Sequence, residues 1–152
     1  MMVPQCSECG AAYADETDSC AARFDQLLAL DHSRREPWGS RHGQAFAAFA
    51  LQHPARFAGS LDAAWAALYR IYCLNELPAA VFAGLRAAAA GNMRTSPPLP
   101  PRPASVTMRP EVTIVDLEDF AATTYPTRLD TWCVATLRAY GQPVTWPRPN
   151  ER

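Results

Sequence analysis

The chain has 152 residues, of which 49% are apolar and 19% are charged, and its formal net charge is −1. These values exclude an intrinsically disordered chain, and the near-neutral charge gives no electrostatic reason to expect a nucleic acid or an anionic membrane as a partner. We therefore expect one globular domain, because this length is typical of a single domain.

The N-terminus and the cysteines predict the compartment. Residues 1–10 carry neither a basic segment nor an apolar core, and no apolar run approaches the ~18 residues that a membrane span needs. The odd number of cysteines, with three near the N-terminus, is typical of metal binding in a reducing compartment rather than of a secreted disulfide framework. We expect a cytoplasmic protein with no membrane partner. The cysteines are Cys6, Cys9, Cys20, Cys73 and Cys133.

Two amphipathic helices are predicted first. Residues 20–31 have apolar side chains at helical spacing, and Asp18 or Ser19 can act as the N-cap. Residues 42–53 form the second helix, which Pro54 would end. Because a short loop joins the two segments, we expect them to lie antiparallel.

Two further helices follow in the N-terminal half. Apolar residues cover most of the circumference of the helix predicted for residues 61–74, so it should be largely buried, with Ser60 as its N-cap. In the helix predicted for residues 78–91, Pro78 suits the first turn and Gly91 is placed to end it.

The C-terminal part begins after a proline-rich segment. Five prolines between positions 97 and 103 predict an extended connector. Residues 112–117 fit either a short strand or the start of a short helix that is opened by a capping box of Thr113 and Asp116 and runs through Ala122, and we favour the helix. Residues 126–140 predict a last helix that docks on the N-terminal bundle.

These segments predict a mainly α fold, a small bundle of about five to six helices with an N-terminal zinc-knuckle head. We expect a single domain overall. Residues 1–94 would hold the head and the bundle, residues 95–110 the proline-rich connector, and residues 111–152 a C-terminal helical segment that packs on the bundle.

The head carries the strongest chemical signal. Cys6 and Cys9 are separated by two residues and followed by Gly10, which suits two thiolates gripping one tetrahedral ion at a turn with positive φ. Cys20 adds a third sulfur at a helix N-terminus, where the helix dipole favours the thiolate. A redox CxxC is the alternative, but that motif belongs at the start of a helix that follows a strand. We therefore expect Zn²⁺.

His53 is the predicted fourth ligand, with His42 as the alternative. Eleven helical residues separate the two by about 16 Å at 1.5 Å per residue, so one ion cannot bind both. Antiparallel packing of the first two helices pairs Cys20 with His53, Phe24 with Phe49, and Asp31 with His42. Four protein ligands would close the coordination shell, and the expected role of the metal is structural.

A second group of polar residues lies at the other end of this helix pair. A carboxylate of Asp31 that hydrogen-bonds the His42 imidazole could orient a general base, although such a pair more often ties two helix ends together. Together with His32, the pair supports an alternative function as a small metalloenzyme or ligand-binding protein.

The sequence resembles short uncharacterised bacterial proteins, classed as a domain of unknown function, that open with a CxxCG knuckle and a third cysteine. The matching stretches include residues 6–10, residues 20–31, His42 and above all the LQHP motif at residues 51–54. Weaker matches are residues 113–116 and Trp132. The resemblance implies that His53 and the pair of Asp31 and His42 are features common to these proteins. It does not imply any particular activity.

The first functional hypothesis is a non-enzymatic, zinc-stapled helical module that acts through a protein partner or as a regulatory accessory. This hypothesis rests on two features. The four predicted ligands would fill the coordination shell of the metal, and the sequence shows no convincing catalytic nucleophile paired with a general base. Nucleic acid is not expected as a partner, because acidic side chains around the knuckle would repel phosphates. These side chains are Glu8, Asp15, Glu16 and Asp18.

Overall fold

A computed structural model describes residues 3–91 and 98–147. The fold is mainly α, as the sequence predicts, and the one β feature of the described residues is an isolated bridge between Gln5 and Ala12. Short 3-10 turns precede α2 and α3, and a third one lies in the C-terminal part. The helices are α1 (Cys20–His32), α2 (His42–Gln52), α3 (Leu61–Tyr72), α4 (Pro78–Ala89) and α5 (Tyr125–Ala139).

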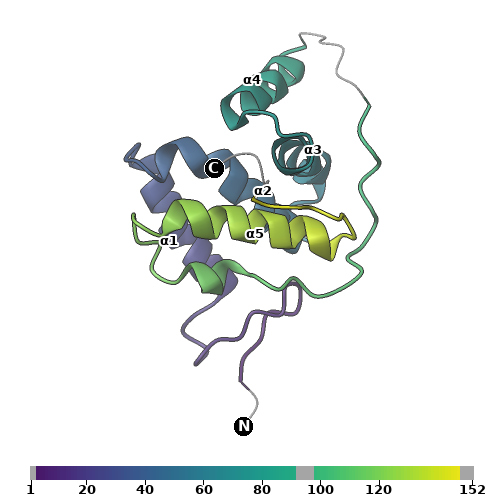
Figure 1. Ribbon diagram of the computed structural model, residues 1–152. Helices are drawn as coiled ribbons and strands as arrows, with labels where there is room; N and C mark the ends of the chain where they lie inside the picture. The colour runs from purple at the N-terminus through teal and green to yellow at the C-terminus, as the bar shows by residue number, and fades with distance from the viewer. Residues whose placement is uncertain (1–2, 92–97, 148–152) are drawn as a thin grey trace.

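Helix α2 lies at the centre of the molecule. It packs against α3 and α5, and α4 lies on the outer side of α3 (Figure 1). Alanine occupies four of the eleven positions of α2, and these small side chains allow the neighbouring helices to approach closely. The core consists mainly of fully buried aromatic and aliphatic side chains, including Trp132, Tyr72, Phe49, Leu51, Leu68 and Leu137.

The predicted packing of α1 on α2 is confirmed by their aromatic contact. The rings of Phe24 and Phe49 are stacked, with centroids 4.0 Å apart and an interplanar angle of 2°. The hydroxyl of Ser19 accepts a hydrogen bond from the Ala22 amide at 3.0 Å, so Ser19 rather than Asp18 is the N-cap of α1. The two helices therefore lie antiparallel, with the end of α2 beside the start of α1.

Ser60 is the N-cap residue of α3, as predicted, but it does not cap the helix with its side chain. Ser60 is the last residue of a 3-10 turn, Ala58–Ser60, and its side chain forms no capping hydrogen bond. Helix α3 also ends at Tyr72, two residues earlier than expected, because the chain turns through Asn75, whose φ is 59°. Leu74 is consequently 45% exposed and does not extend the apolar face of α3.

The proline-rich connector packs on the bundle where it is described, and Pro97 falls outside the described residues. The Trp65 indole donates a hydrogen bond to the Pro100 carbonyl at 3.1 Å, and Arg102 pairs with Asp62 at 3.4 Å. Figure 1 shows this segment following one side of the molecule towards the start of the C-terminal part. The connector is therefore held against α3.

Residues 112–117 form a turn rather than a strand. A 3-10 turn, Ile114–Leu117, opens with the capping box that the sequence predicts, in which the Asp116 carboxylate accepts a hydrogen bond from the Thr113 amide at 2.8 Å. The helix ends at Leu117, well before Ala122, because Glu118 has a φ of 54°. Among the described helices, none combines the length and apolar character that a membrane crossing requires.

Candidate metal centre

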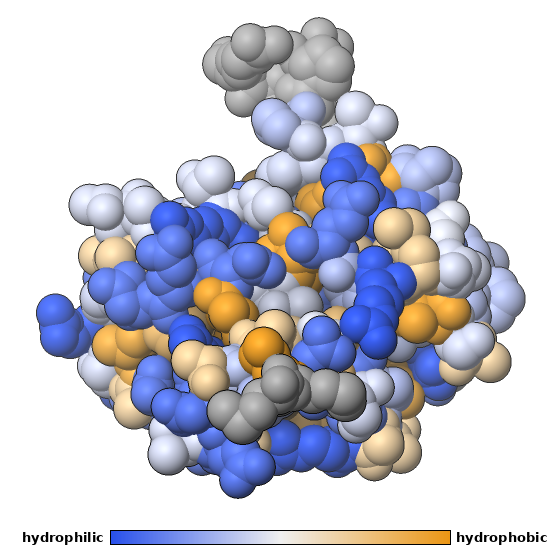
Figure 2. Space-filling view, turned by 90° about the horizontal axis from the view of Figure 1, so that it is seen from below, coloured by the Kyte–Doolittle hydropathy of each residue, from blue (hydrophilic) through white to orange (hydrophobic). Residues whose placement is uncertain are grey.

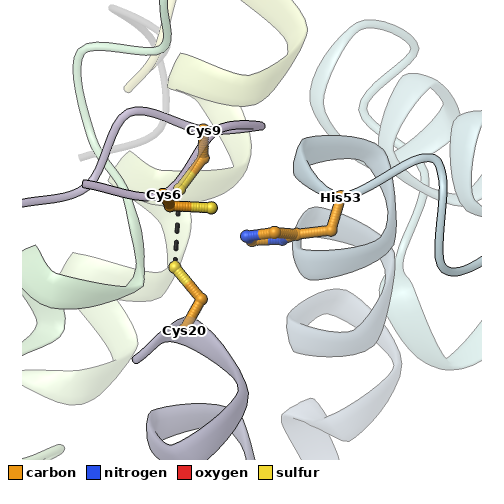
Figure 3. Close-up of side chains that lie close together, drawn as sticks. All are labelled: Cys6, Cys9, Cys20 and His53. Carbon is orange, nitrogen blue, oxygen red and sulfur yellow. Dashed lines mark hydrogen bonds between the residues drawn. The ribbon is translucent and has the colours of Figure 1, made fainter. Parts of the chain in front are cut away.

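Three thiols and one imidazole converge where the N-terminal head meets the bundle. The ligand atoms of Cys6, Cys9, Cys20 and His53 all lie within 4.8 Å of one another. Figure 3 shows the imidazole pointing from the end of α2 towards the three sulfurs. The Sγ atoms of Cys9 and Cys20 are 3.6 Å apart. Zinc–sulfur bonds of about 2.3 Å at tetrahedral angles place two sulfurs about 3.8 Å apart, so this spacing suits one ion.

The turn of the head is built by backbone hydrogen bonds around the first two cysteines. The amide of Gly10 donates to the Cys6 carbonyl at 2.9 Å, and the Cys6 amide donates to the Ala11 carbonyl at 2.8 Å. Gly10 has a φ of +83°, the left-handed conformation that the CxxCG pattern predicts. This conformation turns the chain so that both thiols face the same point.

Cys20 and His53 reach the site from the ends of two helices. Cys20 is the first residue of α1, and His53 directly follows α2. The Nδ1 atom of His53 is 2.8 Å from the Phe49 carbonyl, which makes Nδ1 the protonated nitrogen and leaves Nε2 as the free electron-pair donor. Nε2 is buried and has no hydrogen-bond partner among the described residues. A bound cation would satisfy it.

The electrostatics of the site favour a thiolate at Cys20. The hydrogen bond with the Cys9 thiol is the largest influence and lowers the pKa of Cys20, against the opposing effect of burial. The same hydrogen bond raises the pKa of Cys9. Burial alone would lower the pKa of His53, but the neighbouring Cys20 sulfur and the hydrogen bond to the Phe49 carbonyl raise it overall. The pocket thus stabilises an anionic sulfur, which is the form that binds metal.

Tyr13 is a site residue that the sequence analysis missed. Its hydroxyl donates a hydrogen bond to the Cys20 sulfur at 2.7 Å, and its side chain is buried. A donor to a ligating sulfur orients the thiolate and tunes its charge. Its position four residues after Cys9 is the only hint in the sequence that Tyr13 belongs to the site. The orientation of its side chain depends on how the loop folds back, which the sequence does not reveal.

Glu8 and Gln52 anchor the elements that carry the ligands. The Glu8 carboxylate accepts a hydrogen bond from the Ala55 amide at 3.0 Å, which ties the head to the turn after α2. The Gln52 amide donates to the Val112 carbonyl and to the Thr136 hydroxyl, each at 2.9 Å. The residue before His53 thereby fixes the end of α2 to the C-terminal part of the chain.

The second group of predicted residues lies away from these four. The Nδ1 atom of His42 is 2.9 Å from Asp31 Oδ2, and His42 begins α2, whereas His53 follows its end. The Asp31 side chain is fully buried, and that of His42 is 39% exposed. The exposed His32 lies beside it, with its ring centroid 5.6 Å from that of His42. His42 is therefore outside the cysteine cluster.

The comparison with family models covers most of the chain. The model described as Family of unknown function (DUF5946) matches residues 4–141. The chain belongs to this family. The DUF5946 match includes the head, both helices that carry ligands and α5, and it confirms the resemblance to an uncharacterised family. Comparisons with curated proteins and with solved structures gave no match.

Proposed function

We propose that the chain holds one structural zinc ion through Cys6, Cys9, Cys20 and His53. The observation that carries this proposal is the convergence of four ligand atoms within 4.8 Å, one of them a buried imidazole nitrogen that finds no hydrogen-bond partner in the described part of the chain. Three thiolates and a neutral imidazole are a donor set that zinc prefers. The ion would join the N-terminal head to the start of α1 and the end of α2.

The biological role that we propose is non-enzymatic. Four protein ligands leave no open position for water or substrate, which supports a structural rather than a catalytic metal. None of the five cysteines, all of which lie in the described part of the chain, forms a disulfide, which suits a reducing cytoplasm. We infer that the stapled domain acts through a protein partner or as a regulatory accessory. Figure 2 supports a reversible contact, because the face around the head is mostly hydrophilic with separate apolar patches.

Cobalt substitution tests whether the coordination shell is closed. We expect the Co²⁺-loaded protein to show thiolate charge-transfer bands and the intense visible bands of a tetrahedral ion. Added azide or cyanide should leave these bands unchanged, since no exchangeable ligand is present. A spectrum that shifts with azide would reveal an open position and would favour a catalytic metal.

A second candidate function is a small metalloenzyme or ligand-binding protein with its site near Asp31, His32 and His42. One observation favours it: Asp31 Oδ1 is buried and has no hydrogen-bond partner among the described residues, while Oδ2 holds the His42 ring. If this site is functional, Asp31→Asn and His42→Ala should abolish an activity or a ligand-induced shift without a matching loss of stability. Variants that change stability alone would remove this candidate.

A further inference from the structure

A cavity of about 580 Å³ lies between helix ends on the side of the molecule away from the cysteine cluster. Its walls come from the start of α2, the end of α3, the starts of α4 and α5, and the C-terminal segment. The volume is in the range of sites for small organic ligands. Its polar lining includes Arg41, Gln44, Asn75, Glu76 and Asp130, and Trp146 supplies an aromatic wall.

A chain of buried hydrogen bonds holds Asp130 in place. The Gln44 side-chain amide donates to the Tyr72 hydroxyl at 2.8 Å, and that hydroxyl donates to Asp130 Oδ1 at 2.7 Å. Tyr72 and Gln44 are only 1% and 5% exposed. The position of the carboxylate is therefore fixed by groups that cannot move without disturbing the core.

Among residues 3–91 and 98–147, no cationic side chain forms an ion pair with Asp130. Glu76 is paired with Arg70 at 3.2 Å. Arg41 lines the cavity, but its guanidinium donates to the Pro37 carbonyl at 2.9 Å and lies 3.5 Å from Glu36. Burial raises the pKa of Asp130, against smaller opposing effects of Tyr72 and Arg41. A cationic ligand would relieve this desolvation cost.

Trp146 provides an apolar surface beside the carboxylate. Its ring packs edge-to-face on Tyr72, with centroids 4.9 Å apart. A second cavity, of about 430 Å³, lies along α5, and both Asp130 and Trp146 line it as well. The carboxylate and the indole are therefore reachable from two sides, and together they offer a charge partner and an aromatic face.

We propose that this cavity is a binding site for a small organic cation, in which an ammonium or guanidinium group pairs with Asp130 and an apolar body packs on Trp146. The site is independent of the proposed zinc centre. An anion attracted by Arg41 is the competing ligand, but the hydrogen bonds of that guanidinium to Glu36 and Pro37 make it the less available partner.

Three ligands of similar shape and different charge test the proposal by isothermal titration calorimetry on the full-length protein. The probes are phenethylammonium, neutral phenethyl alcohol and anionic 3-phenylpropanoate, each up to about 10 mM. We expect saturable binding of the cation and none of the other two. Equal binding of the alcohol, preference for the anion, or no saturable binding of the cation would overturn the proposal.

Variants locate the binding. Asp130→Asn retains an acceptor for Tyr72 but removes the charge, and it should weaken binding of phenethylammonium roughly tenfold or more. Asp25→Asn, on the exposed face of α1, is the matched control and should leave the affinity unchanged. Unchanged affinity in Asp130→Asn would contradict the assignment.

Chemical-shift mapping on the wild-type protein makes the test independent of any variant's folding. The largest change on adding phenethylammonium should fall on the Trp146 indole N–H and on the amides of residues 127–131. Changes centred on another surface would overturn the proposal.

Discussion

At the scale of single residues, the Tyr13 hydroxyl is the contact that most directly affects the proposed metal ligands. Tyr13→Phe removes the hydrogen bond to the Cys20 sulfur and leaves the ring in place. We expect the variant to bind zinc roughly tenfold more weakly, because groups that orient metal ligands typically contribute that much to affinity. Competition with a coloured chelator measures the difference.

Tyr69→Phe is the matched control for this prediction. Tyr69 is a half-buried tyrosine of α3, outside the cysteine cluster, so its variant should bind zinc as the wild type does. Equal affinities for all three proteins would show that the Tyr13 hydroxyl does not act on the metal.

The raised pKa of Asp130 predicts that the stability of the protein depends on pH. This raised pKa means that the folded state holds the proton more tightly than the unfolded state does. The carboxyl therefore contributes stability below its unfolded pKa of about 3.9, and this contribution is lost as the pH rises through the higher folded pKa. We expect Asp130→Asn to be more stable than the wild type at pH 7, with the difference shrinking towards pH 4.

Urea unfolding of the two proteins side by side checks this sign. Metal loss at low pH affects both proteins alike and cancels in the difference. A variant that is less stable at pH 7, or a difference that does not change with pH, would contradict the prediction.

At the scale of the helices, the contact between α2 and α4 is set by one glycine. A Cβ atom at Gly43 would lie 2.5 Å from the ring of Phe82, so Gly43→Ala forces that ring to move. We expect a loss of about 1 kcal/mol or more in the free energy of unfolding, as for other overpacked sites.

Gly84→Ala, inside α4, should instead increase the free energy of unfolding. A Cβ atom there has no neighbour within 4 Å, and alanine is favoured over glycine in a helix by about 0.5–1 kcal/mol. Denaturant unfolding of both variants tests the pair. Effects of the same sign would show that Phe82 does not pack on Gly43 as described.

The antiparallel pairing of α1 and α2 was predictable because it depends on local signals. A capping serine, a short loop and Pro54 define two helices, and the register then places Phe24 on Phe49 and Cys20 near His53. The contacts of Gln52 with Val112 and Thr136 were not predictable, since they join residues 60 and 84 positions apart. The same holds for Asp130, whose environment depends on the packing of four separate segments.

At the scale of the whole molecule, metal removal should loosen the head and spare the bundle. The head is held by the four proposed ligands and a few hydrogen bonds, whereas α2, α3 and α5 share a buried apolar core. We expect the zinc-bound form to be more stable by about 2.7 kcal/mol when free zinc is 100 times the Kd. Chelation should raise hydrogen exchange in residues 5–20 while the α2 amides stay protected. Unchanged exchange in the head would contradict a stapling role.

Metal content per chain tests the central claim most directly. We would purify the wild type, His53→Ala and His42→Ala, confirm the helical content of each by circular dichroism, and count bound metal by mass spectrometry. The account predicts one zinc ion in the wild type and in His42→Ala, and loss of that ion from His53→Ala. A wild type without stoichiometric metal, or zinc that is retained by His53→Ala, would contradict it.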